Sequence, residues 1–290
     1  MRTKATGYRR RATRGPNGKV TLGPKYRPKT PRTKKDLTKF IKAVTLKEAE
    51  PKYVAETIIS KVAHNGVISE AGGWYRCLPL LKQGDADSQD QSWIRRGKMV
   101  TPYGKLAVHW DIHLKSTLAY SRDIYVVLYV LQERARRQYP VADAGGQNPE
   151  HYAAYLDDGA GNNTNFAGDW ASSHYPVEKD FFIPLHKKVW RLCKPSGQNT
   201  GISVVGVGSN TGQYSMSMPV AIHHSWHYTL PKVLRYDDGP ADSGDVPTQL
   251  PTNTSPIWGV GYFYANGEAA DVATQCIEVS CRAEMGFKDM

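Results

Sequence analysis

The sequence predicts an all-β protein: an eight-stranded antiparallel single jelly roll of two packed sheets, with long loops and a disordered basic N-terminal arm. Three observations lead to this prediction. Apolar and polar residues alternate over several segments, no segment alternates strands with long amphipathic helices, and Lys and Arg are concentrated in the first 42 residues. An immunoglobulin-like sandwich and a barrel are alternatives with similar strand content.

The charge distribution divides the chain into two parts. The 290 residues carry 38 Lys or Arg and 27 Asp or Glu, a formal net charge of +11. Residues 1–42 hold fifteen of the basic residues and one acid, Asp36, so their net charge is +14 and that of the remaining chain is −3. We therefore expect a nucleic-acid-binding arm at 1–42 and a separate jelly-roll domain at 43–290.

The arm has the composition of a disordered polycation. Residues 1–35 contain four prolines, no acid and few large aliphatic side chains, so they cannot bury enough apolar surface to offset the entropy of ordering. A tail that merely aids solubility is the alternative. Basic side chains suit phosphate neutralisation, and tyrosines beside them suit base stacking. The predicted nucleic-acid-binding residues are Arg2, Lys4, Arg9, Arg10, Arg11, Arg14, Lys19, Lys25, Arg27, Lys29, Arg32, Lys34, Lys35, Lys39, Lys42, Tyr8 and Tyr26.

The elements after the arm follow from periodicity. Leu37, Ile41 and Val44 are spaced for one face of a short helix, which Pro51 should end. Beyond it, residues 105–114 and 277–285 alternate strictly, which predicts strands with one buried face, and the apolar run 124–131 predicts a strand buried on both faces. In chain order the predicted strands span 53–62, 74–81, 105–114, 122–132, 180–192, 224–236, 256–265 and 277–285.

Long polar stretches separate these strands, at 83–93, 140–175, 195–219 and 237–255. Because loops longer than about 15 residues usually serve a function, we expect them to form binding or assembly surfaces. The four cysteines contain no C-x-x-C pair and are expected to be reduced thiols. No apolar segment follows the basic start of the chain, so we expect no secretory signal.

The sequence shows no catalytic motif. A P-loop, a G-x-S-x-G elbow and an H-E-x-x-H pair are all missing, and we expect no enzyme and no cofactor. His223 and His227 would share a strand face, but no third metal ligand accompanies them at a diagnostic spacing. Asp157–Asp158 and Asp237–Asp238 are possible calcium ligands, although such loop pairs more often form turns. The longest apolar run has eight residues, and a membrane-spanning helix needs about 20, so we expect no membrane partner.

Several short strings resemble motifs of the capsid proteins of circovirus-like (CRESS) viruses, which have circular single-stranded DNA genomes. Residues 78–84 followed by 95–98 are similar to that family's strand, "QG" turn and "R-x-G" entry to the next strand. Residues 182–190 resemble the strand with a basic turn in these capsid proteins. Residues 234–237 resemble the end of one of their late strands, and residues 286–289 resemble their C-terminal strand. The resemblance lies in the order of these motifs along the whole chain.

The resemblance implies a viral structural protein, a capsid protein that self-assembles into a small icosahedral T=1 shell of roughly 60 copies. Its arm would face the interior and package single-stranded DNA. The clusters Arg9–Arg10–Arg11 and Lys34–Lys35 would also serve as a nuclear localisation signal. The expected locations are therefore the virion and the host nucleus, and the expected partners are single-stranded nucleic acid, the host nuclear import machinery and an unidentified host receptor.

Two basic clusters in the body are possible inner-face contacts to the genome: Arg95, Arg96, Lys98, Lys187, Lys188 and Arg191. Their alternative role is a solvated strand edge that discourages stray pairing. Two other functions remain open, namely the capsid protein of a small RNA virus with the same jelly roll and a non-viral nucleic-acid-binding β-sandwich protein. An enzyme that uses the region of His223 and His227 is a third alternative.

Overall fold

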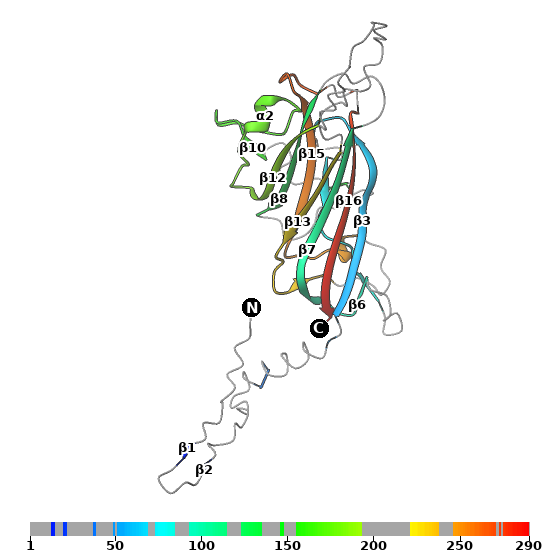
Figure 1. The fold of residues 1–290 in the computed structure, drawn as a ribbon, viewed down its shortest axis with the longest axis vertical. Coiled ribbons are helices and arrows are strands. Elements are labelled where there is room, and N and C mark those ends of the chain that lie inside the picture. Colours follow the sequence, from blue (N-terminus) through cyan, green and yellow to red (C-terminus); the bar gives the residue numbers. More distant parts are fainter. Residues whose placement is uncertain are drawn as a thin grey trace, which may run out of the picture. The chain divides into compact units, whose positions relative to one another are not determined.

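Two antiparallel β-sheets pack face to face to form the body of the protein (Figure 1). The computed structural model describes residues 13–14, 20–21, 37–38, 49, 51–68, 73–84, 93–114, 123–134, 146–147, 155–192, 221–237, 246–270, 273 and 275–289. The prediction of an all-β protein with packed antiparallel sheets is confirmed.

The first sheet has the strand order β13-β7-β16-β3, with the short strand β14 also paired to β7. The last long strand, β16, lies between β7 and β3 and is antiparallel to both. The first and the last long strands of the body are therefore neighbours. The bounds are β3 (Pro51–His64), β7 (Met99–Leu114), β13 (Ala221–Tyr228), β14 (Leu234–Arg235) and β16 (Ile277–Asp289).

The second sheet has the order β12-β8-β15-β4-β9, again with antiparallel neighbours. Its edge strand β12 approaches β13, the edge of the first sheet, where the Nε2 atoms of His186 and His224 lie 3.0 Å apart. The bounds are β4 (Trp74–Arg76), β8 (Ile124–Glu133), β9 (Gly146–Gln147), β12 (Phe182–Leu192) and β15 (Pro256–Tyr264).

Shorter elements connect or cover the sheets, and two more lie in the N-terminal segment. Contacts within the chain divide it into two units, Met1–Glu48 and Ala49–Met290. In the first unit, Leu37 and Thr38 are helical, and the other positions of the predicted helix lie outside the described residues. The short elements are β1 (Thr13–Arg14), β2 (Val20–Thr21), β5 (Lys82–Gln83), β6 (Ile94–Arg95), β10 (Leu156–Asp157), β11 (Asn163–Thr164), α2 (Trp170–His174) and α3 (Val246–Gln249).

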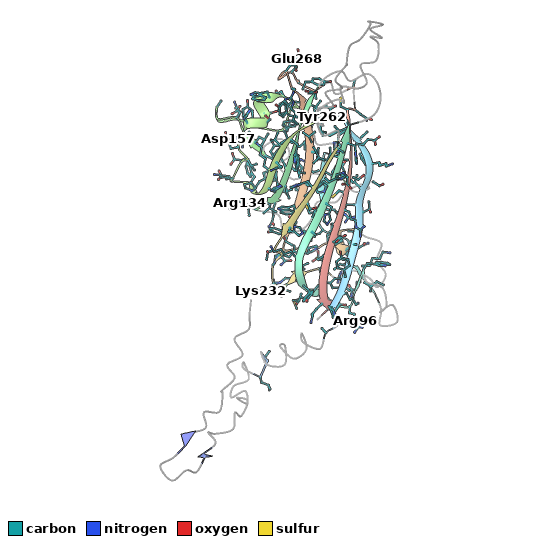
Figure 2. All side chains as sticks on the ribbon, in the orientation of Figure 1. Arg96, Arg134, Asp157, Lys232, Tyr262 and Glu268 are labelled. Carbon is teal, nitrogen blue, oxygen red and sulfur yellow. The ribbon has the colours of Figure 1, made fainter. Side chains whose placement is uncertain are left out.

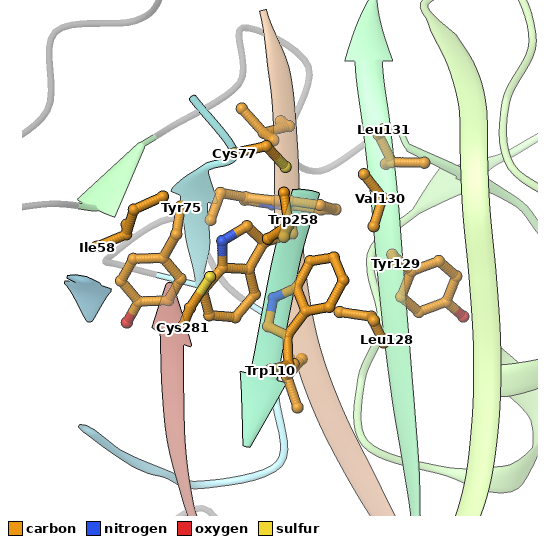
Figure 3. Packing of buried hydrophobic residues seen from close by; sticks show 14 of the residues in the cluster. Ile58, Tyr75, Cys77, Trp110, Leu128, Tyr129, Val130, Leu131, Trp258 and Cys281 are labelled. Atoms are coloured by element: carbon orange, nitrogen blue, oxygen red, sulfur yellow. The ribbon is translucent and has the colours of Figure 1, made fainter. Parts of the chain in front are cut away.

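The core forms where the alternating strands turn their apolar residues inward. Leu106, Val108, Trp110 and Ile112 of β7 are fully buried, and the residues between them are not, as the alternation predicts. The alternating residues of β16 behave in the same way. Figure 3 shows Trp110 of the first sheet beside Trp258 of the second, and their rings meet edge to face with centroids 6.0 Å apart.

The prediction for the 140–175 stretch is wrong in part. Its described residues do not form only an exposed loop, because Tyr155 and Phe166 are fully buried against the second sheet. The ring of Tyr155 contacts those of Trp74 and Tyr129. This cover is needed because β8 is apolar on both faces, as its sequence predicts, and its second face would otherwise meet water.

Two predicted strands end earlier than expected. The segment predicted at 74–81 is a strand only over β4, and it then turns so that the backbone N–H of Leu80 donates to the Glu56 carboxylate. The segment predicted at 224–236 is divided into β13 and β14. Pro231 lies between them, and a proline has no N–H to donate to a strand ladder.

Candidate nucleic-acid interface

The predicted residues of the arm lie outside the described residues, with the backbone of Arg14 as the exception. Arg14 pairs with Val20 in the β1–β2 ladder. Nucleic-acid binding by the arm and its disorder stay predictions. The surface of the body is described in detail, and it carries a basic region of its own.

Exposed basic residues gather at one end of the body, where β3 begins and β16 ends. Pro51 lies opposite Lys288 there, so this is also the end at which the N-terminal segment joins the body. Figure 2 shows Arg96 and Lys232 at this end and Asp157 and Glu268 toward the other. We call this surface the basic end and define it by five exposed side chains: Arg96, Lys98, Lys105, Lys232 and Arg235.

Backbone pairing brings these residues together from distant parts of the sequence. Arg235 of β14 lies opposite Met99 at the start of β7, and the N–H of Tyr236 donates to the Lys98 carbonyl at 2.8 Å. Lys105 follows Gly104, whose φ of 83° opens an irregularity in β7. The basic end is therefore formed by tertiary structure, and only Arg96 and Lys98 of it were among the predicted contacts.

Arg95, which was predicted as an inner-face contact, lies in the interior. Its side chain is fully buried, and its guanidinium group lies 4.5 Å from the centre of the Tyr236 ring. It donates to four carbonyl oxygens, those of Leu81 (3.3 Å), Gly97 (2.7 Å), Asp237 (3.3 Å) and Thr248 (2.7 Å). In this fold Arg95 thus joins its own segment to those of Leu81, Asp237 and Thr248.

The second predicted cluster, in β12, does not form one basic surface. Lys187 Nζ donates to the carbonyls of Ser173 (2.8 Å) and Tyr175 (3.3 Å) and lies 5.0 Å from the centre of the Tyr129 ring. Desolvation lowers the pKa of Lys187. Its neighbour Lys188 points to the opposite side of the strand, and Arg191 forms a 2.6 Å ion pair with Asp123.

Aromatic side chains accompany the basic end. Tyr53, Trp93 and Tyr103 are all exposed, and Lys82 Nζ lies 5.2 Å from the centre of the Trp93 ring. Lys82 and Trp93 also line a surface pocket of about 320 Å³ beside β3. Sequence reasoning missed Tyr103 because the alternation in β7 begins only at Lys105, whereas the strand starts at Met99. Cations next to exposed rings are the usual components of a surface for single-stranded nucleic acid.

The metal candidates do not assemble a coordination site in the described part of the chain. His223 and His227 share the exposed face of β13, and His223 Nδ1 lies 2.5 Å from an Asp111 oxygen. No group of three or more His, Cys, Asp or Glu residues among the described positions is arranged to hold a metal ion. Asp157 and Asp158 accept backbone N–H bonds from residues two positions on, so they form turns. Asp238 lies outside the described residues.

Cys77, Cys276 and Cys281 are buried thiols that form no disulfide among the described residues, and Cys193 lies outside those residues. Among the described helices, none has the length and apolar character needed to cross a membrane. No protein-family model matches the chain, and no curated protein matches it. The function proposed below rests on the charge distribution, the strand order and the surface described above.

Proposed function

We propose that this protein is a viral capsid protein that self-assembles into a small icosahedral shell and packages single-stranded DNA through its basic N-terminal arm. The observation that carries the proposal is the separation of charge: +14 on residues 1–42 and −3 on all the rest. A chain of this kind can hold a polyanion with one segment while the other segment packs against its own copies without strong repulsion.

The strand order supports a jelly roll for the body. In chain order the eight principal strands are β3, β4, β7, β8, β12, β13, β15 and β16. Their pairs are nested: β3 with β16, β4 with β15, β7 with β13 and β8 with β12. Nested antiparallel pairs divided between two sheets are what rolling up one long hairpin produces, and double-sheet jelly rolls recur in viral capsid proteins.

The charge of the arm suits the packaging of a genome. Roughly 60 copies would bring about 840 positive charges to the interior, enough to neutralise on the order of a thousand phosphates. The basic end provides further exposed cations on the body itself. A circovirus-like virion, with nuclear import through the arginine and lysine clusters of the arm, is the setting in which we propose that the protein acts.

Electron microscopy and light scattering of the purified full chain test the proposal. We expect closed particles of uniform size that contain nucleic acid, and digestion of the extracted polymer by DNase but not by RNase. A species that stays near 32.3 kDa at high concentration would refute the capsid. RNase-sensitive contents in purified virions would refute the DNA genome and favour the capsid of an RNA virus.

The division of labour has its own test. Deletion of residues 2–42 should leave a folded body that still assembles but retains much less nucleic acid, because the electrostatic contribution of the arm is lost. As a matched control, replacement of the fifteen basic residues of the arm by Gln keeps its length and removes its charge, and should give the same result. Loss of folding in both variants would contradict the separation of roles.

A further inference from the structure

Two exposed tyrosines stand in one row across the first sheet. Tyr53 of β3 and Tyr103 of β7 both lie directly opposite Gly286 of the intervening strand β16. Residues opposite each other in antiparallel strands point to the same face, and Gly286 lies between the buried Met285 and Phe287. The row Tyr53–Gly286–Tyr103 therefore lies on the outward face of the sheet.

The contacts of the two rings agree with this placement. Tyr53 is 54% exposed, and its hydroxyl donates to the Glu284 carboxylate, the next outward residue of β16. Tyr103 is 64% exposed, and its Cδ1 would lie 3.5 Å from a Cβ at Gly286. Such a Cβ would also stand 2.7 Å from the Tyr103 carbonyl oxygen, so only glycine fits here. The surface between the two rings is thus left without a side chain.

The charges around the row favour an anionic occupant. Lys105 lies two residues after Tyr103, Lys288 lies two residues after Gly286 on the same strand face, and both are at least partly exposed. The two nearby carboxylates already have cationic partners. Glu284 pairs with Arg282 at 3.0 Å, and Asp289 pairs with Lys52 at 2.9 Å.

Chain continuity points to the same occupant. Tyr53 is the third residue of β3, and residues 1–50 lead directly into that strand. A polymer bound by the basic arm would therefore be tethered to the body through the strand that carries Tyr53. A partner protein would not require cations beside both rings, whereas a single strand of nucleic acid presents flat bases and phosphates in alternation.

We propose that Tyr53 and Tyr103 form a stacking platform on which two bases of single-stranded nucleic acid rest, one on each ring, with Lys105 and Lys288 on the adjoining phosphates. The inference rests on the proposed function, since it names where on the body the packaged strand is held. In other proteins, four-stranded sheets bind single strands by the same physics, with exposed aromatic side chains that stack two or three bases.

The test uses the full chain and two fluorescent probes of equal length, oligo(dT) and an abasic oligomer with the same number of phosphates. Affinities are measured by anisotropy at high salt, where the electrostatic contribution of the arm is small. We expect the wild-type protein to bind oligo(dT) more tightly than the abasic probe. Tyr103→Ala should weaken oligo(dT) binding by about 5-fold to 150-fold, the range for loss of one stacked base. Tyr53→Ala should do the same.

The controls separate stacking from other effects. Tyr103→Phe and Tyr53→Phe retain the rings and should keep wild-type affinity, and no variant should change binding of the abasic probe. Trp170→Ala removes an exposed ring from α2, at the other end of the body in Figure 1, and should not change binding to either probe. Thermal unfolding of each variant verifies that it folds.

Three results would overturn the platform. If the Ala variants bind oligo(dT) as the wild type does, the rings do not stack bases, although salt-dependent binding at low ionic strength would leave the arm's function intact. If the Ala variants block particle assembly and leave affinity unchanged, the rings pack against a second copy. If the wild type binds neither probe at any salt concentration, the proposed packaging function fails together with the platform.

Discussion

Arg95 offers a sharp test of whether a basic residue in the body serves structure or nucleic-acid binding. Its guanidinium group is enclosed between Tyr236 and four carbonyl oxygens that belong to four separate parts of the described chain. The substitution Arg95→Met keeps much of the side-chain length and removes the charge and all five N–H donors. The neighbouring exposed residue provides the control, Arg96→Met, which makes the same chemical change at the surface.

The expected magnitude follows from the contacts of Arg95. Each buried carbonyl left without a donor costs about 1–3 kcal/mol, although Gly97 and Asp237 lie near solvent and can recruit water. The carbonyls of Leu81 and Thr248 carry the main loss, since Leu81 is fully buried and the bond to the half-buried Thr248 is short, at 2.7 Å. We therefore expect Arg95→Met to lower the free energy of unfolding by about 3–5 kcal/mol, and Arg96→Met to change it by less than about 0.5 kcal/mol.

Urea unfolding followed by tryptophan fluorescence measures the difference, with protein concentration held constant because assembly raises apparent stability. Folded Arg95→Met should bind nucleic acid as the wild type does, and Arg96→Met should bind more weakly. If Arg95→Met leaves stability unchanged but lowers affinity, then Arg95 contacts nucleic acid, and the structural role derived from its burial is wrong.

Three further predictions concern salt, pH and packing. Nucleic-acid binding should fall with salt with a log–log slope of about −7 if roughly ten phosphates are engaged per arm, and a slope near zero in a salt titration would exclude electrostatic binding. Burial lowers the pKa of His64 to about 4, so the folded state binds fewer protons than the unfolded state and stability should fall by up to about 3 kcal/mol as the pH drops from 6.5 to 4. His64 Nε2 has no hydrogen-bond partner in the described structure, so His64→Phe should be tolerated at pH 7 and should flatten this dependence of stability on pH. If the dependence does not change in His64→Phe, it arises from other groups, such as the His186–His224 pair. Gly261→Ala would place a Cβ 2.4 Å from the Phe166 ring and should cost about 1–3 kcal/mol in thermal unfolding, whereas wild-type stability would show that the cover over the second sheet is loosely packed.

The strands were predictable to the extent that their burial repeats with period two. In β7 and β16 each inward position is apolar, so the sequence alone identifies the strand and its buried face. The ends were less predictable, because β7 continues back to Met99 through Pro102 and Gly104, which no periodicity marks as strand. The pairing of β14 with β7 could not be predicted either, because it depends on how the chain turns at Pro231 between β13 and β14.

The candidate site was predictable only where charge is local in the sequence. The arm is evident from a count of Lys and Arg, but the basic end draws its members from two strands, β7 and β14, and from the two segments that precede them. A run such as Arg95–Arg96 reveals neither that the first residue is buried nor that the second is exposed. The Tyr53–Gly286–Tyr103 row depends on register between strands more than 180 positions apart in the sequence, and no short-range pattern encodes that register.

The same electrostatics favours different roles for the arm and the body in the proposed function. Several cations of the body have partners that hold the fold together: Arg76 binds Glu56 through two bonds of 2.6 and 2.9 Å, and Lys52 pairs with Asp289. The guanidinium group of Arg95 donates its hydrogen bonds to backbone carbonyls. Residues 1–35 contain no carboxylate at all, so their cations have no acid within the same segment to pair with. A polyanion therefore meets most of its counter-charge on the arm, and the body can contribute mainly where exposed cations and rings coincide, which in the described residues is the end where β3 begins.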